Sequence, residues 1–323
     1  MSSIIENIFT ALFVASVLRV STPLLFPSLG ALMSDRVGAI NVGLEGMMLS
    51  SAFTGVMLTG HGVNLWVGVF AGLAVAILLA LVIAVFHIEL RADLILAGLA
   101  VNILASGATT ALLFEFVGDK GSSATLGSKV VPNLRLHLDW VPGVGEFLDT
   151  AIGDQNLLTW LAVAAIPITW FVLQRTSLGT HIRAVGENPD AATAAGINTR
   201  RVRYLALSSS GLLAGLGGIH LGMGYLSLFQ RDFTAGRGFI ALAAPALGGG
   251  RPGRTALAAL LFGGSDALAT QLGSLDITPQ YIQVIPYVTT LVALLIYSVR
   301  AERRIQRSIV GEADQAAVEV KVP

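Results

Sequence analysis

The sequence predicts an all-α polytopic membrane protein, and its composition and the spacing of its charged residues support that fold class. Of its 323 residues, 54% are hydrophobic and 12% are charged, whereas roughly a quarter of the residues in soluble domains are charged. Several runs of about twenty positions carry no charge, which is the length that crosses a bilayer. The zero net charge argues against a nucleic-acid partner. The absence of cysteine excludes disulfides and thiolate metal sites.

Hydrophobic runs between charged residues predict about ten transmembrane or re-entrant helices. Their approximate ranges are 3–19, 21–34, 38–60, 64–87, 92–117, 156–175, 200–226, 235–250, 254–274 and 278–298. The first range lacks a basic leader and a cleavage site, which predicts an uncleaved span. The second and eighth are short and lie beside Gly or Pro, as expected for broken or re-entrant segments that line a protected cavity.

An external loop over about 118–155 divides the predicted helices into two halves, about 1–117 and 156–298, with five helices each. An odd number of spans in each half inverts the second half relative to the first, as in many transporters. No residue-level repeat is visible, so this inversion rests on counting spans. We expect residues 1–310 to form one transmembrane domain and residues 311–323 to form a disordered cytoplasmic tail.

The basic residues predict that both termini are cytoplasmic, because cytoplasmic loops carry an excess of Lys and Arg. The residues that this topology places inside are Arg36, Arg91, Arg175, Arg183, Arg200, Arg201, Arg203, Arg251, Arg254, Arg300, Arg303, Arg304 and Arg307. The external loop holds Lys120, Lys129 and Arg135, diluted by acidic residues. Arg19, Arg231 and Arg237 fall near the outer side and go against the rule.

A short helix over about 189–195 has clear start and stop signals. Asn188 can cap its N-terminus, and Pro189 suits the first helical position because no N–H is needed there. Asp190 favours the positive end of the helix dipole, and Gly196 suits the left-handed residue that ends a helix. Two Ala-rich turns are not stable alone in water, so this helix must dock on other elements. On the cytoplasmic side, it offers a place where an external motor can push.

Asn41 and Glu45 are candidate pathway residues in the third predicted span, one helical turn apart. Glu45 lies inside an apolar run, where a carboxylate is costly unless it is paired or hydrated. One interpretation is a helix-packing motif in which Glu45 bonds to a neighbouring helix. The other places both residues on a translocation path. Asn102, in the fifth span, either contacts substrate beside them or bridges two helices.

Arg237 and Phe239 follow glycines at the start of the eighth predicted helix. Either Arg237 pairs with an acidic residue, or it lines the external mouth and shapes the substrate cavity together with Phe239. The acidic candidates for such a pair are Asp232, Glu115 and Glu45. Asp266 lies midway along the ninth span and requires a buried partner or a hydrated path, and a structural pairing is favoured.

The segment from Arg36 to Leu49, RVGAINVGLEGMML, closely resembles the signature of bacterial ABC-importer permeases for nucleosides and simple sugars. These belong to the wider branched-chain amino acid and ribose permease group. The resemblance continues, in order, through ADLILAGLAVN at 92–102, GENP at 186–189, AGRGFIALAA at 235–244, LFGGSDAL at 261–268 and IPYVTTL at 285–291. Arg251 departs from the family pattern in the GGGRPGR turn.

The resemblance implies a permease subunit that moves nucleosides or related small ribosides or sugars across the bacterial inner membrane. It implies three protein partners: an ABC ATPase, a second and nonidentical permease, and an extracytoplasmic substrate-binding lipoprotein. Membrane lipid is the surrounding partner. The short cytoplasmic helix matches the family's coupling helix, and the residues implied in contact with the ATPase are Gly186, Glu187, Asn188, Pro189, Asp190, Ala191, Ala192 and Gly196.

The chain carries no motif for hydrolysing ATP. Its three lysines do not fit a G-x-x-x-x-G-K-[ST] string, and no catalytic or metal-like spacing is present. We therefore expect no catalytic residue, metal or cofactor on this chain, with ATP used by the partner subunit.

Two other kinds of transporter are open alternatives. One is an ion-coupled secondary transporter in which Glu45 and Asp266 carry protons, and the other is an ABC permease for sugars or branched-chain amino acids. The capped cytoplasmic helix favours an ATPase-driven protein, because a self-contained transporter needs no docking element. A membrane enzyme ranks last because no catalytic residues are found.

Overall fold

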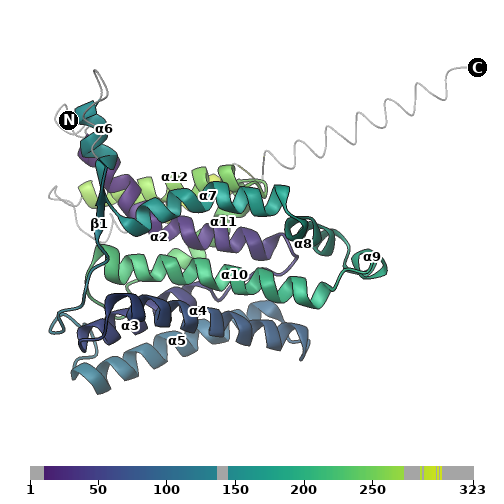
Figure 1. Cartoon of the computed structure of the whole chain (residues 1–323), viewed down its shortest axis with the longest axis horizontal. Coiled ribbons are helices and arrows are strands. Elements are labelled where there is room, and N and C mark those ends of the chain that lie inside the picture. The colour runs from purple at the N-terminus through teal and green to yellow at the C-terminus, as the bar shows by residue number, and fades with distance from the viewer. Residues whose placement is uncertain are drawn as a thin grey trace, which may run out of the picture.

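The computed structural model describes residues 11–136, 145–272 and 284–299, the last range without residues 286, 296 and 298. Long helices lie side by side along one direction and form a bundle (Figure 1). The main helices are α2 (Ala11–Asp35), α3 (Leu44–Gly60), α4 (Leu65–Ile88), α5 (Leu94–Val117), α7 (Leu157–Arg175), α8 (Ser177–Glu187), α9 (Pro189–Ala194), α10 (Thr199–Ile219), α11 (Arg237–Leu247) and α12 (Pro252–Leu272).

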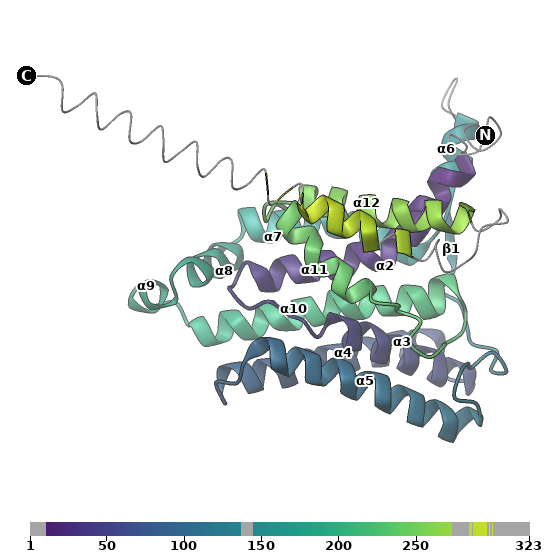
Figure 2. The same cartoon turned by 180° about the vertical axis from the view of Figure 1, so that it is seen from behind.

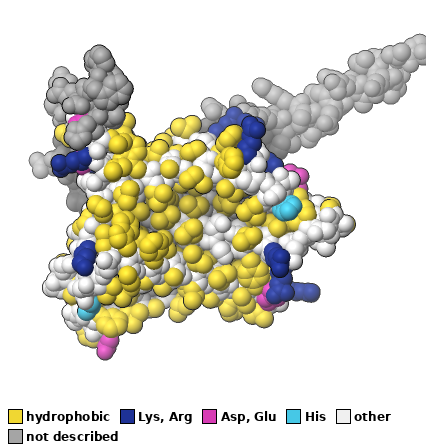
Figure 3. Space-filling view, in the orientation of Figure 1, with side chains coloured by type: hydrophobic (Ala, Val, Ile, Leu, Met, Phe, Trp, Pro, Cys, Tyr) yellow, Lys and Arg dark blue, Asp and Glu magenta, His cyan; other side chains and the backbone are white. Residues whose placement is uncertain are grey.

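Five helical stretches are long and apolar enough to cross a membrane, namely α2, α4, α5, α7 and α10 with its extension to Tyr225. Hydrophobic side chains cover the face between the two ends of the bundle, and charged side chains gather at those ends (Figure 3). A broad exposed apolar belt with charged ends is the surface that a bilayer requires. The prediction of a mostly helical, multi-pass membrane protein is confirmed.

The predicted division of the N-terminal region into helices 3–19 and 21–34 is wrong, because α2 continues without a break from Ala11 to Asp35. Thr22 Oγ1 donates to Leu18 O over 2.8 Å, so this polar residue is satisfied inside the helix. Arg19, the charged residue at the boundary between the two predicted ranges, therefore does not end the helix. Residues 1–10, and part of the tenth predicted range, lie outside the described residues, and the count of ten helices stays a prediction.

The predicted external loop contains short elements that the sequence did not indicate. Strands β1 (Asn133–Arg135) and β2 (Asp154–Asn156) pair antiparallel. Beside them lie α6 (Gly145–Leu148) and the π-helix η1 (Asp149–Gly153). These strands lie at one end of the bundle, whereas α8 and α9 lie at the other (Figure 1). The two ends are called here the strand end and the α9 end.

Helices α2 and α10 pack against each other in the middle of the bundle and run in opposite directions. Gly30 faces Ser210 and Leu213, whereas Gly217, further along α10, faces Pro27 and Pro23, nearer the start of α2. In these contacts the residue number rises along α10 while it falls along α2, so the two helices are antiparallel. Each of the two helices is followed by a segment that turns back into the bundle.

Two helices, α3 with 17 residues and α11 with 11, begin inside the bundle where those returning segments end (Figure 2). They are called here the half-helices. Residues 36–43 connect α2 to α3, and residues 226–236 connect the extension of α10, the π-helix η2 (His220–Tyr225), to α11. Helix α11 then runs to the α9 end, since Gly250, just beyond it, accepts hydrogen bonds from the Arg36 side chain that follows α2. The short eighth segment is therefore confirmed as a helix of 11 residues.

Candidate functional site

Glu45 joins the starts of the two half-helices. It is in the first turn of α3, and its carboxylate accepts hydrogen bonds from Gly236 N at 2.8 Å and Gly238 N at 2.6 Å, at the start of α11. Free N–H groups and a partial positive charge are found at every helix N-terminus. One carboxylate therefore compensates the positive ends of two helices inside the bundle. This geometry gives Glu45 the inter-helix bond that the packing interpretation predicted.

The backbone that leads into α11 adopts unusual conformations. Asp232 and Ala235 have φ values of 51° and 46°, and Gly236 has a φ of 73°. Left-handed conformations cost free energy in residues other than glycine and persist only where surrounding contacts hold them. Here the Tyr287 hydroxyl donates to Ala235 O over 2.6 Å, and Ser106 Oγ donates to Asp232 over 2.7 Å. Together with Glu45 of α3, these side chains from two other helical segments fix the approach to α11.

Asn102 bridges two helices. Its Oδ1 accepts from Gly46 N at 2.8 Å, and its Nδ2 donates to Val42 O at 2.9 Å. Both ends of the amide from α5 therefore hold the backbone at the start of α3. The third and fifth predicted spans are neighbours, as the substrate hypothesis required, and a role of Asn102 in substrate contact stays a prediction.

Asn41 does not lie one helical turn from Glu45, because α3 begins only at Leu44. The Asn41 side chain is fully buried, and its Nδ2 donates to Ser210 Oγ on α10 over 3.0 Å. Its Oδ1 accepts from Gly43 N, which stabilises the non-helical segment. Asn41 therefore faces α10, while Glu45 faces α11.

Arg237 and Asp266 form an ion pair between α11 and α12, with Nη2 and Oδ2 2.8 Å apart and each side chain 21% exposed. The three acidic partners considered from the sequence are wrong, whereas the expected pairing of Asp266 is confirmed. Asp232, for example, contacts Arg231 instead. Phe239, two residues beyond Arg237, is 44% exposed.

Removing the charge of Asp266 should destabilise the protein. In an Asp266→Asn variant, Arg237 keeps a largely desolvated charge without its ion partner, which costs about 2–3 kcal/mol. Thermal unfolding in detergent should show a clearly lower midpoint. The matched control is Arg231→Gln, whose pair with Asp232 is 61% and 55% exposed and should change stability by less than about 1 kcal/mol. Equal midpoints for the two variants would contradict this prediction.

The short helix predicted over 189–195 is present as α9 and has the predicted cap. Asn188 Oδ1 accepts from Asp190 N at 3.1 Å and from Ala191 N at 3.0 Å, and Pro189 takes the first position. Gly196 has a left-handed φ of 82°. Ala192 is the buried residue of α9 and packs in a cluster with residues of α8 and α10.

Helix α8, which the sequence did not predict, connects α9 to the rest of the bundle. It is capped by Thr176, whose Oγ1 accepts from Gly179 N over 3.2 Å, and this Thr is the signal that could have revealed it. At its other end, Gly186 lies directly against the backbone of Arg36. The Arg36 guanidinium donates to Gly250 O, just after α11. Contacts therefore run without a gap from α9 through α8 and Arg36 to α11.

The family model for the permease component of the branched-chain amino acid transport system matches residues 13–294. The chain belongs to this family. It is the membrane-spanning permease subunit of an ABC transporter, which confirms the resemblance found in its motifs.

Alignments with related permeases span most of this chain. It is 35% identical over 307 residues to the guanosine ABC transporter permease protein NupQ of Bacillus subtilis (strain 168), covering 90% of this chain and 93% of NupQ. It is 34% identical over 298 residues to the nucleoside ABC transporter permease protein NupC of Lactococcus lactis subsp. cremoris (strain MG1363), covering 88% and 92% of the two chains. Identity to the ribose import permease protein RbsC of Escherichia coli (strain K12) is 27%, over 91% and 88%.

Among solved structures, the permease resembles PsaBC from Streptococcus pneumoniae in complex with Fab. The TM-score is 0.52 at 13% sequence identity, over 90% of this chain and 94% of that chain. This likeness shows a shared fold.

Proposed function

We propose that this permease carries neutral nucleosides, or related small ribosides and sugars, inward across the cell membrane. The observation that supports this substrate class is the position of Glu45 at the start of α11. In transporters, the N-terminus of a broken helix commonly binds an anionic group of the substrate. Here Glu45 already occupies that position with two hydrogen bonds. A substrate carboxylate or phosphate would meet a negative charge instead of free N–H groups.

The charge of Arg237 is also taken, because Asp266 pairs with it. Neither the backbone N–H groups bound by Glu45 nor the Arg237 guanidinium is then left to attract an anion. This disfavours amino acids and nucleotides as substrates. Phe239 and Tyr287, which border the same turn, are 44% and 45% exposed. Largely apolar sites with aromatic walls and a few polar groups are typical of small-molecule binding. Each of these exposed rings offers a face on which a nucleobase or sugar ring can stack, and the nucleoside relatives favour the nucleobase.

Uptake competition tests this assignment. Cells that depend on this permease should accumulate labelled guanosine, and unlabelled nucleosides should compete. Leucine and guanosine monophosphate, which carry a carboxylate and a phosphate, should not compete at a hundredfold excess. If ribose competes and nucleosides do not, the substrate class is sugars and not nucleosides. Transport of leucine would overturn the proposal of a neutral substrate.

The proposed topology places the α9 end and the C-terminus in the cytoplasm, with an ABC ATPase bound at α9. The start of α2 then faces outward, against the sequence prediction of a cytoplasmic N-terminus, because α2 runs as one helix from the strand end to the α9 end. Support comes from the basic residues at that end and from the projection of α9 beyond the bundle (Figure 1).

We further propose that the two halves are inverted repeats. In each half a long helix, α2 or α10, is followed by a returning segment and a half-helix, and the two long helices run in opposite directions. A second, nonidentical permease and an extracytoplasmic binding protein complete the proposed importer.

The cap of α9 should matter for coupling. Asn188→Ala removes the acceptor of two backbone N–H groups, which costs about 1 kcal/mol in a helix of only six residues. Uptake and substrate-stimulated ATP hydrolysis should both fall severalfold at unchanged protein level. The matched control is Asn64→Ala, which removes the cap of α4 at the strand end and should leave coupling intact. Normal uptake by the Asn188 variant would argue against an ATPase contact at α9.

A further inference from the structure

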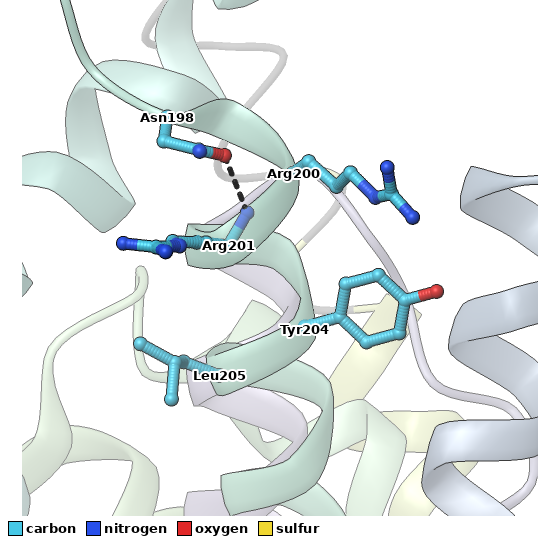
Figure 4. A pocket seen from close by; sticks show the side chains of 5 residues that line it. All are labelled: Asn198, Arg200, Arg201, Tyr204 and Leu205. Atoms are coloured by element: carbon cyan, nitrogen blue, oxygen red, sulfur yellow. Dashed lines mark hydrogen bonds between the residues drawn. The ribbon is translucent and has the colours of Figure 1, made fainter.

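A pocket of about 450 Å³ lies on the first two turns of α10, at the α9 end of the bundle. The residues that line it are Asn198, Arg200, Arg201, Tyr204 and Leu205. Figure 4 shows Arg200 and Tyr204 projecting to one side of the helix, and Arg201 and Leu205 to the other. The two guanidinium groups therefore lie on opposite flanks of the helix. None of these residues takes part in the contacts around Glu45.

The pocket is positively charged. Arg200 Nη2 lies 2.6 Å from Glu89 Oε1, and the Tyr204 hydroxyl donates to the same carboxylate over 2.9 Å. Glu89 therefore compensates Arg200, and the described residues give Arg201 no ion pair, so the positive charge of Arg201 is left over. Asn198 Oδ1 accepts from Arg201 N over 2.9 Å, so the helix N-terminus is capped by its own side chain. The attraction for an anion consequently comes from the Arg201 guanidinium.

A strip of α10 that holds two exposed leucines, with Ser208 and Ser209 between them, leads away from this pocket. Leu205 is 51% exposed, and Leu212, two turns further along the same face of α10, is 37% exposed. The strip leads from the charged end of the bundle towards the hydrophobic side chains between its two ends. At membrane interfaces, basic and tyrosine side chains lie at the level of the lipid headgroups, and apolar side chains contact the acyl chains. The start of α10 has this arrangement.

We infer that this pocket binds the headgroup of an anionic phospholipid from the surrounding membrane. The phosphate lies at Arg201, on the flank of α10 that also carries Leu205, and an acyl chain follows Leu205 and Leu212. Basic pockets between helices on the cytoplasmic side are known to bind such headgroups. The inference rests on the proposed topology, which puts the α9 end in the cytoplasm. A lipid suits the site better than a protein segment because the cations border an apolar helix flank.

Native mass spectrometry of the purified, delipidated full-length chain tests the inference. Wild-type protein should bind phosphatidylglycerol several times more tightly than phosphatidylcholine with the same acyl chains. Arg201→Gln leaves the Arg200–Glu89 pair intact and should weaken phosphatidylglycerol binding about fivefold. Arg254→Gln is the matched control, because Arg254 is an exposed arginine in the first turn of α12 at the same end. That control should bind like wild type.

Further arms separate a lipid from other occupants. Leu205→Ser should weaken phosphatidylglycerol binding if an acyl chain lies on the strip. Displacement of the lipid by millimolar inorganic phosphate, with no effect of Leu205→Ser, would overturn the inference in favour of a soluble anion. Unchanged lipid binding by Arg201→Gln, with loss of the ATPase on co-purification, would overturn it in favour of a protein contact. Equal melting temperatures in phosphatidylcholine should show that each variant folds. These assays use no substrate, so they are independent of the proposed transport function.

Discussion

Substituting Glu45 by glutamine is expected to reduce guanosine uptake at least tenfold while the protein still reaches the membrane. Glutamine keeps one acceptor oxygen but places an NH₂ group against one of the two backbone N–H groups that Glu45 now binds. Two donors then face each other, and the negative charge between two helix N-termini is lost. A hydrogen bond to a charged group contributes about 1.5–3 kcal/mol, and the charge–dipole attraction adds up to about 2 kcal/mol. The start of α11 should therefore loosen.

Initial uptake rates and thermal midpoints should be measured for Glu45→Gln, Glu45→Asp and Glu115→Gln. Aspartate keeps the charge on a shorter arm and should give an intermediate loss. Glu115 is an exposed carboxylate on α5, so its substitution controls for the general effect of losing a charge. If Glu45→Gln shows wild-type uptake and stability, the contact between the Glu45 carboxylate and the start of α11 is not essential.

Local signals in the sequence predicted α9 well, because its cap, its first residue and its final glycine all act within two turns of chain. The Asn188 side chain bonds to backbone groups two and three positions away, so its neighbours in sequence determine its role. The continuity of α2 was not predictable in this way. Arg19 looked like a boundary between two spans, yet α2 continues through it, and the buried residues that follow pack against helices far away in the chain.

The charged contacts show the same limit. Asp266 was expected to be paired, since an unpaired carboxylate is costly within a span, but the identity of Arg237 as its partner depends on how α11 packs on α12. Glu45 binds backbone N–H groups of residues 236 and 238. Nearly every residue carries the same backbone N–H group, so the sequence does not indicate which one Glu45 binds. That contact could only be found in the structure. Arg36, which bonds to Gly250 O, escaped prediction for the same reason.

Alanine in place of Gly186 is expected to uncouple ATP hydrolysis from transport. A Cβ atom at this position would overlap the carbonyl oxygen of Arg36, so the end of α8 would have to move away from the turn after α2. That turn also bonds to Gly250 through the Arg36 side chain. Alanine favours helices more than glycine by about 1 kcal/mol. A loss of function would therefore come from the steric contact and not from a weaker helix.

The measurements are guanosine uptake and ATP hydrolysis by the assembled transporter. Uptake should fall more than tenfold, and stimulation of ATP hydrolysis by substrate should disappear, while the ATPase still co-purifies. Gly253→Ala is the matched control, since a Cβ at Gly253, in the first turn of α12, meets no atom within 4 Å. If Gly186→Ala transports like that control, the contact between α8 and Arg36 transmits no motion. Force from α9 would then have to reach the half-helices through α10, which follows α9 in the chain and packs against α3.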